Sequence, residues 1–263
     1  MSSALLTGGA IGFIFVMTCL GAATVFFFRK AAPGKFQQIF LGFAAGVMIA
    51  ASIWSLLIPA IEAAEAKGQI GWIPAACGFV LGALFLLGLD KVIPHLHPFS
   101  SEPEGPVSRS KRSTLLLYAV TLHNIPEGMA VGLSFALAAK HGNDPALYAT
   151  AIALALGIGI QNFPEGAAVA LPIRQEGASA RKAFGLACLS GVVEPVFAII
   201  TVLLAAWIFP IMPWLLSFAA GAMIYVVVEE LIPEAHLGEH SHAGTLGVMA
   251  GFLLMMVLDV ALG

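Results

Sequence analysis

The residues best suited to chemistry in this sequence form one motif that occurs twice. The first copy reads His123-Asn124-Ile125-Pro126-Glu127-Gly128, and the second reads Gln161-Asn162-Phe163-Pro164-Glu165-Gly166. Each copy lies inside a long apolar run. A carboxylate inside a membrane is energetically costly, so an ionisable residue there indicates a functional site. Two glutamates in the same local sequence therefore predict the two halves of one site.

Helical spacing groups the polar residues of each copy. Residues four apart share a helix face, which places His123 beside Glu127, and Gln161 beside Glu165. Asn124 directly follows His123, and Asn162 directly follows Gln161. Pro126 and Pro164 each remove a backbone hydrogen bond and favour a kink. A third carboxylate, Glu194, precedes Pro195 about 11 residues into another apolar run, so we expect a kink and an acid at similar depth there.

Three buried carboxylates without a basic partner repel one another and should not all ionise. A divalent cation or bound protons must therefore compensate their charge. One imidazole, three carboxylates and amide oxygens, without thiolate, suit Zn, Fe, Mn, Co and Cd. Carboxylates from two helices can bridge two ions. We expect Glu127 and Glu165 to be shared, His123 and Gln161 to complete one ion, and Asn124, Asn162 and Glu194 to complete the other.

Composition places this chain in a membrane. Of its 263 residues, 59% are hydrophobic and 10% are charged, whereas soluble domains carry about 25% charged residues. The net charge of −3 and the lack of a basic run argue against a nucleic-acid partner. Cys19, Cys77 and Cys188 have no spacing typical of metal binding and are interpreted as small buried residues.

A membrane span needs about 20 apolar residues. All spans should be α-helical, because backbone polar groups in lipid must pair within the segment. We expect a flexible cytoplasmic loop at 94–113 and a single transmembrane domain over 1–263. The sequence predicts eight spans, at roughly 4–28, 36–61, 72–93, 114–139, 147–171, 183–208, 214–232 and 244–262.

Basic residues predict the orientation. Ten of the twelve Lys and Arg residues follow the odd-numbered spans, and only Lys67 and Lys140 follow even-numbered ones. Cytoplasmic loops are rich in Lys and Arg, so both termini should lie outside the cytoplasm. The fourth and fifth spans then run in opposite directions with one motif each. This arrangement is typical of inverted-repeat transporters, which bind their substrate at the membrane midplane.

The paired motifs, Glu194 and the segment Val228-Glu229-Glu230-Leu231-Ile232-Pro233-Glu234 resemble the ZIP (Zrt/Irt-like) family of divalent-metal transporters. Asp90-Lys91-x-Ile93-Pro94-His95-x-His97 resembles its bacterial GufA-type branch. The resemblance implies uptake of Zn²⁺ or a similar ion across the bacterial inner membrane into the cytoplasm, without an organic cofactor. It also implies a binuclear site between the fourth and fifth spans with a contribution from the sixth.

The resemblance further implies a 3+2+3 helix arrangement, an elevator-like carrier and a homodimer surrounded by membrane lipids. Many family members carry His or Asp where this chain has Gln161 and Asn162. Neutral amides lower the negative charge of the site. They therefore predict a weaker second ion or a changed metal preference.

Two further groups of residues have both a functional and an ordinary interpretation. Asp90, Glu229 and Glu230 form either an exit relay or separate interfacial acids, and Asp259 either helps to admit cations or simply ends a helix. The loop residues His95, His97 and His236 either hold metal weakly or are solvated.

Two other functions use similar residues. An intramembrane metal-dependent hydrolase needs an open coordination position for water, and these helices lack a His-Glu-x-x-His pattern. A metal sensor would bind the ion without passing it. Carrier and channel are both compatible with this sequence.

Overall fold

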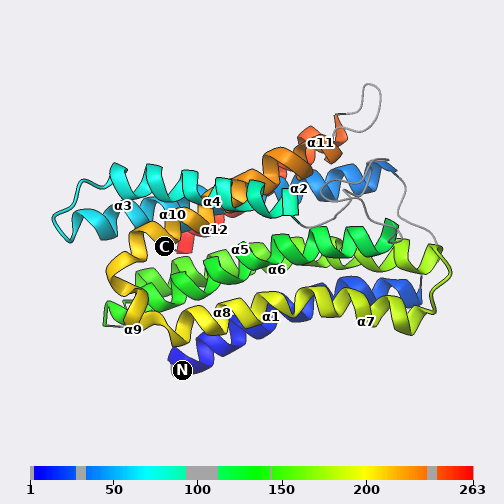
Figure 1. The fold of residues 1–263 in the computed structure, drawn as a ribbon, viewed down its shortest axis with the longest axis horizontal. Coiled ribbons are helices and arrows are strands. Elements are labelled where there is room, and N and C mark those ends of the chain that lie inside the picture. Colours follow the sequence, from blue (N-terminus) through cyan, green and yellow to red (C-terminus); the bar gives the residue numbers. More distant parts are fainter. Residues whose placement is uncertain (1–2, 28–33, 93–111, 143, 236–241, 263) are drawn as a thin grey trace.

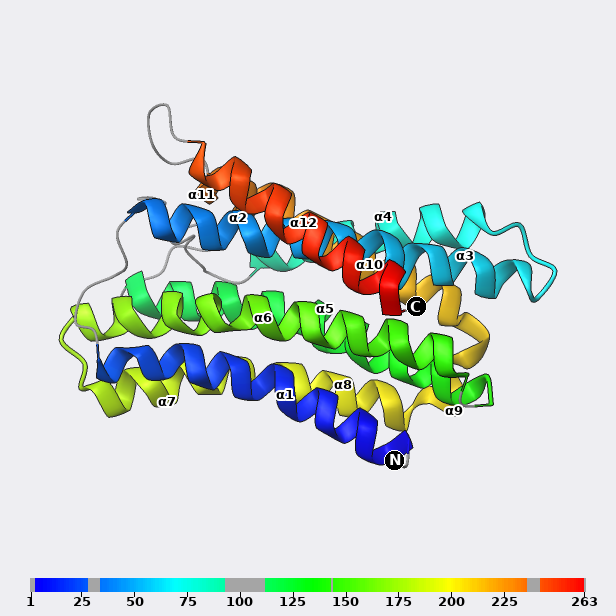
Figure 2. The ribbon, with the colours of Figure 1, turned by 180° about the vertical axis from the view of Figure 1, so that it is seen from behind.

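The structure is a computed structural model that describes residues 3–27, 34–92, 112–142, 144–235 and 242–262. Within these ranges the chain is helical and contains no strand. The helices run side by side in two layers, which Figures 1 and 2 show from opposite sides. Both chain ends lie toward the same end of the bundle, at left in Figure 1.

The first layer, which is the lower one in Figure 1, contains the two motifs and Glu194. Its elements are α1 (Ser3–Ala23), η1 (Thr24–Phe26), α5 (Arg112–Lys140), α6 (Pro145–Gln175), α7 (Ala180–Gly191) and α8 (Val193–Leu203). The short α9 (Ala205–Ile208) and η3 (Phe209–Ile211) lead from α8 to the second layer.

The second layer, above the first in Figure 1, is formed by the remaining helices. They are α2 (Gly34–Ala51), η2 (Ser52–Leu57), α3 (Ile58–Glu65), α4 (Trp72–Val92), α10 (Met212–Val226), η4 (Val227–Leu231), α11 (Ile232–Ala235) and α12 (Ala243–Leu262). The all-helical class predicted from the sequence is therefore confirmed for the described residues.

Seven helical segments of the described chain are long and apolar enough to cross a membrane. The remaining predicted span, the fourth at 114–139, corresponds to α5, which has 29 residues but is less apolar. The polar residues of the first motif cause this difference.

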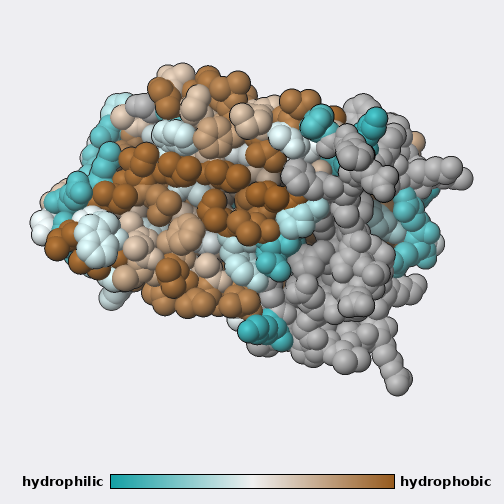
Figure 3. All heavy atoms as spheres, turned by 90° about the horizontal axis from the view of Figure 1, so that it is seen from above, coloured by the Kyte–Doolittle hydropathy of each residue, from teal (hydrophilic) through white to brown (hydrophobic). Residues whose placement is uncertain are grey.

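Exposed large apolar residues cover α4 and α12, and Figure 3 shows apolar side chains over most of the described face seen from above. This composition identifies a membrane protein.

Small residues let the helices of each layer pack closely. A Cβ atom on Gly42 or Gly46 of α2 would overlap the backbone of α12, and one on Gly82 of α4 would overlap that of α10. The first layer uses Gly166 of α6 against α1 and Gly128 of α5 against α8. Close approach through small residues is the usual way in which helices associate in membranes. Four helix pairs, α1 with α6, α5 with α8, α2 with α12 and α4 with α10, thus form the framework.

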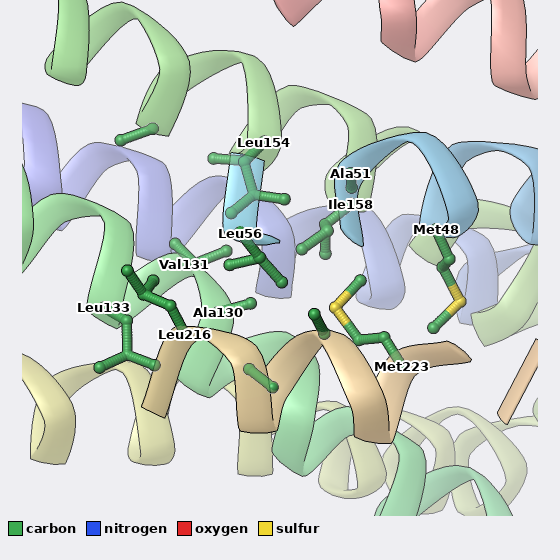
Figure 4. Close-up of a cluster of buried hydrophobic side chains, with 14 of the residues drawn as sticks. Met48, Ala51, Leu56, Ala130, Val131, Leu133, Leu154, Ile158, Leu216 and Met223 are labelled. Atoms are coloured by element: carbon green, nitrogen blue, oxygen red, sulfur yellow. The ribbon is translucent and has the colours of Figure 1, made fainter. Parts of the chain in front are cut away.

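An apolar core joins the two layers. Leu154 and Ile158 of α6 and Val131 of α5 meet Leu56 of η2 and Leu216 of α10 in Figure 4. All five side chains are fully buried. This core fixes the central helices α5 and α6, which carry the motifs, against the second layer.

Prolines alter the helices in ways that the predicted spans do not show. α5 and α6 continue without interruption through Pro126 and Pro164. The predicted sixth span is divided instead, because α7 ends at Gly191 and α8 begins at Val193. Pro195 has no N–H for the Gly191 carbonyl, which explains the break at this point.

Two turns of π-helix were also missed. In η2 and η4 the N–H groups of Ile58 and Ile232 donate to carbonyls five residues earlier. Pro59 and Pro233 follow directly and cannot donate a bond of the ordinary α type. α5 already begins at Arg112, within the predicted loop 94–113, and the rest of that predicted loop lies outside the described residues.

Candidate metal site

Three buried amide side chains are oriented in the same manner. The nitrogen of Gln161 donates to Glu127 Oε1 at 2.8 Å, and the nitrogen of Asn124 donates to the Ser190 carbonyl at 3.2 Å. The nitrogen of Asn162 donates to Glu194 Oε2 at 2.5 Å. The oxygens of all three amides are buried and have no hydrogen-bond donor. In each amide, the nitrogen therefore donates to another group of the protein, whereas the oxygen has no hydrogen-bond donor.

Two carboxylates also keep an unpaired oxygen. Glu127 accepts from Gln161 through one oxygen, while its Oε2 has no partner, and Glu165 Oε1 is likewise buried and unpaired. Electrostatic interactions link Glu165 to Glu127, Glu194 and His123. A buried acceptor without a partner is costly. These oxygens need a positively charged or hydrogen-donating ligand.

Glu194 differs from the other two carboxylates. Its side chain is fully buried and both of its oxygens accept hydrogen bonds, one from Asn162 and one from Thr18 Oγ1 at 3.4 Å. Thr18 belongs to α1, so this helix forms part of the site. Sequence reasoning missed Thr18, because a threonine in an apolar helix is usually bonded to its own backbone.

His123 connects the two layers. Its Nε2 contacts Glu230 Oε1, which lies on the π-helical turn η4 of the second layer. Both side chains are buried. Helical spacing predicted that His123 lies on the same helix face as Glu127, and this stays a prediction. The imidazole contacts Glu230, a residue that was assigned to the exit side.

Glycines bring the helices of the site together. A Cβ atom on Gly128 would overlap the backbone of Glu194, and one on Gly166 would overlap the Thr18 carbonyl. The glycine of each motif therefore lets a neighbouring helix supply side chains to the site.

Among the described residues, no three His, Cys, Asp or Glu side chains form a cluster that could hold an ion. Glu127 and Glu194 each contact an amide, and His123 contacts Glu230. A metal ion at this place would depend on the amide oxygens as much as on carboxylates. Oxygen-rich donor sets with one imidazole suit borderline and hard divalent ions.

The auxiliary residues fall into three groups. Glu229 is exposed and Glu230 is buried, so the interpretation as an interfacial acid applies only to Glu229. Asp259 is buried, accepts from Ser55 Oγ at 2.7 Å and keeps Oδ2 unpaired. His95, His97 and His236 lie outside the described residues, and so does the side chain of Asp90.

The fold and the site together define an integral membrane protein with a polar centre between apolar helices. The family model "ZIP Zinc transporter" matches residues 4–114 and 100–259. The chain is 37% identical to human "Zinc transporter ZIP11" over 95% of both chains. It is 41% identical to "Zinc transporter GufA" of Myxococcus xanthus, with 80% of this chain and 81% of the relative covered. It is 40% identical to "Zinc transporter ZIPB" of Bordetella bronchiseptica, with 97% and 80% covered.

The chain belongs to the ZIP family. The resemblance inferred from the paired motifs is therefore confirmed. Members of this family are transport proteins, which decides against the intramembrane hydrolase. Family membership supports metal transport, with a divalent metal ion such as Zn²⁺ as the substrate.

Proposed function

We propose that this protein carries divalent transition-metal ions, above all Zn²⁺, into the cytoplasm through a midplane site between α5, α6 and α8. One observation carries the proposal. Five buried oxygens, from Asn124, Glu127, Gln161, Asn162 and Glu165, have no hydrogen-bond donor in the described structure. A divalent cation supplies the missing positive charge and coordinates several such oxygens at once.

The donors divide into two positions that share Glu127 and Glu165. His123 and Gln161 complete the first position, and Asn124, Asn162 and Glu194 surround the second. We propose that both hold an ion during transport and that Zn, Cd, Fe, Mn and Co are accepted. Donors of moderate strength allow ligand exchange, so an ion can be released again.

The helix pairs support an inverted repeat. Pairing of α1 with α6 corresponds to pairing of α8 with α5, and pairing of α2 with α12 corresponds to pairing of α10 with α4. We propose a 3+2+3 arrangement in which α5 and α6 are the central pair and α5, as the fourth span, brings the number of spans to eight. The surrounding helices shield its polar residues from lipid. Both termini would lie outside the cytoplasm of a bacterial inner-membrane protein, which we expect to be a homodimer.

The contact between His123 and Glu230 suggests the route out of the site. An ion that leaves the first position would pass Glu230 and then Glu229, toward Asp90 and the loop histidines. On the opposite side, the free oxygen of Asp259 is suited to attract an entering cation. Each of these acids offers oxygen ligands to an ion that has lost part of its hydration shell.

The direct test is metal influx into proteoliposomes that contain the purified protein. We expect saturable Zn²⁺ flux in the wild type and a loss of at least about 100-fold in Glu127→Ala and Glu165→Ala, because each removes a shared ligand. Glu65→Ala changes an exposed acid at the end of α3 and should behave like the wild type. Binding should weaken as the pH falls, because protons compete with the ion for the ligands.

Other outcomes would decide between the remaining functions. Metal binding without flux in the wild type would favour a sensor. Flux that survives both glutamate substitutions would mean that the ion does not pass between α5 and α6.

A further inference from the structure

Among the described residues, Ser134 of α5 carries the one buried hydroxyl without a hydrogen-bond partner. Its side chain is 5% exposed, and its Oγ neither donates nor accepts a bond. Every other buried serine or threonine of the described chain bonds to a carbonyl or an acid, namely Thr18, Ser52, Ser55, Ser190, Thr201 and Ser217. Ser134 is the exception that needs a reason.

The helix itself offers this hydroxyl an acceptor. A serine inside a helix can bond back to the carbonyl four residues earlier, and both Ser52 and Ser217 do so. For Ser134 that acceptor is the Ala130 carbonyl, which the hydroxyl does not use. A buried polar group without a partner is costly. Packing alone would therefore favour alanine, which has nearly the same volume and no polar side-chain atom.

Ser134 lies on the helix face that carries two of the proposed metal ligands. It follows Glu127 by seven residues and His123 by eleven, which corresponds to about two and three turns of an α-helix. The rise of the helix places it about 10 Å from Glu127 along the axis. α5 ends at Lys140, on the side that we expect to face away from the cytoplasm. The hydroxyl is thus located between the motif and the outer end of the helix.

The two layers are in contact along this stretch of α5. Val131, which lies between Glu127 and Ser134 in the helix, is fully buried. Together with Leu56 and Leu216 of the second layer it belongs to the apolar core that joins the layers (Figure 4). Transporters open one side of their binding site by moving one helix bundle against another. When the layers separate at this level, the face of α5 that carries Ser134 becomes part of the opening.

We propose, on the basis of the proposed function, that Ser134 is a further ion-contact residue. Its hydroxyl oxygen binds the partly dehydrated metal ion between the outer side and the site at Glu127. Oxygens of the protein can replace water in the hydration shell of an ion that enters a narrow passage. The lone pairs of Ser134 are available for this step, because no protein group uses them. The contact is transient, since a single neutral oxygen holds a divalent ion weakly.

The test measures metal influx into proteoliposomes that contain the purified full-length protein, and thermal unfolding of the same variants in detergent. Ser134→Ala removes the oxygen and keeps the size of the side chain. Zn²⁺ influx should fall about tenfold, the equivalent of one lost interaction with a charged group. The Tm should be no lower than in the wild type, because no bond within the protein is lost. Equilibrium Zn²⁺ affinity should change by less than about twofold, because the motif ligands are intact.

Ser134→Cys provides a readout that packing does not produce. A thiol prefers softer ions than a hydroxyl does, so the ratio of Cd²⁺ to Zn²⁺ influx should rise about fivefold relative to the wild type. The matched controls are Ser217→Ala and Ser217→Cys. Ser217 is fully buried, bonds to the Pro213 carbonyl and packs against Gly78 of α4. Both control variants should keep the influx and the metal ratio of the wild type.

Each contrary result has a distinct meaning. Wild-type influx in Ser134→Ala would overturn the proposal and make Ser134 a small packing residue, and a lower Tm would make its hydroxyl a structural group. An unchanged metal ratio in Ser134→Cys, or a loss of Zn²⁺ affinity as large as the loss of influx, would also overturn it. A wild type that passes no metal would instead overturn the proposed function itself.

Discussion

The two layers of the molecule bury polar side chains in different ways. In the first layer, amides from α5 and α6 donate to neighbouring helices and leave their oxygens free. In the second layer, Ser52 and Ser217 bond to carbonyls of their own helices. The first layer therefore keeps several buried oxygens free to accept from a ligand, whereas these two serines of the second layer satisfy their hydroxyls within the helix.

The second layer nevertheless contributes two buried acids. Glu230 contacts His123 across the layers, and Asp259 pairs with Ser55 within the second layer. Glu230 and Ser55 both lie on π-helical turns that precede a proline. Turns of π-helix are frequently found at functional sites. Each of these π-helical turns therefore places one polar side chain, Glu230 or Ser55, against a partner on another helix. The motif helices α5 and α6 instead carry several buried oxygens that could bind an ion.

The largest effect should come from separating α5 from α8 in the first layer. Gly128→Val would drive a side chain into the backbone of Glu194. We expect a destabilisation of about 3 kcal/mol, at the upper end for overpacking, and complete loss of Zn²⁺ flux. Thermal unfolding in detergent and proteoliposome influx measure the two effects.

Gly88→Val is the matched control, because a Cβ atom on Gly88 of α4 would meet no atom within 4 Å. It should leave flux unchanged. If both variants behaved alike, the close contact between α5 and α8 would not support the site.

An intermediate effect is expected at the contact between the layers. Glu230→Ala removes the acid that touches His123, so flux should fall by about tenfold, while Zn²⁺ affinity at the motif residues should change by less than about threefold. Comparing initial influx rates with equilibrium binding separates these quantities. An equal loss of both would place Glu230 among the ligands.

The smallest effect should come from the pair inside the second layer. Ser55→Ala leaves the buried Asp259 with neither oxygen paired, at a cost of about 1–2 kcal/mol in the free energy of unfolding. Ser217→Ala removes a hydroxyl that bonds within its own helix and should cost less than about 0.5 kcal/mol. Denaturant or thermal unfolding of the two variants provides the comparison, and equal values would mean that the Ser55 bond adds no stability.

Much of the fold was predictable because it depends on local composition. Long apolar runs indicated the helices, and the boundaries of α4 and α12 lie within a residue or two of the predicted spans. A kink was expected at Pro195, but a division of the helix at Val192 was not, and neither were the turns η2 and η4. A proline in an apolar segment can be accommodated by an uninterrupted helix, a break or a π-helical turn, and all three occur in this chain.

The candidate site was predictable only in part. The motif residues were recognised because polar groups are rare in apolar helices. Thr18 escaped notice, because a threonine in an apolar helix carries no signal of its own. Glu230 was noticed as an acid, but its contact with His123 joins positions 107 residues apart in the chain.

The sequence by itself determined that this protein lies in a membrane, that it has one repeated donor motif and that it resembles ZIP transporters. These properties follow from residue type and spacing along a single helix. Only the tertiary structure decided which amide oxygens have no hydrogen-bond donor and which carboxylate accepts hydrogen bonds at both oxygens. It also decided that His123 contacts Glu230 of the second layer. Those features depend on how helices distant in the chain approach one another, and glycine contacts such as Gly128 against Glu194 set that approach.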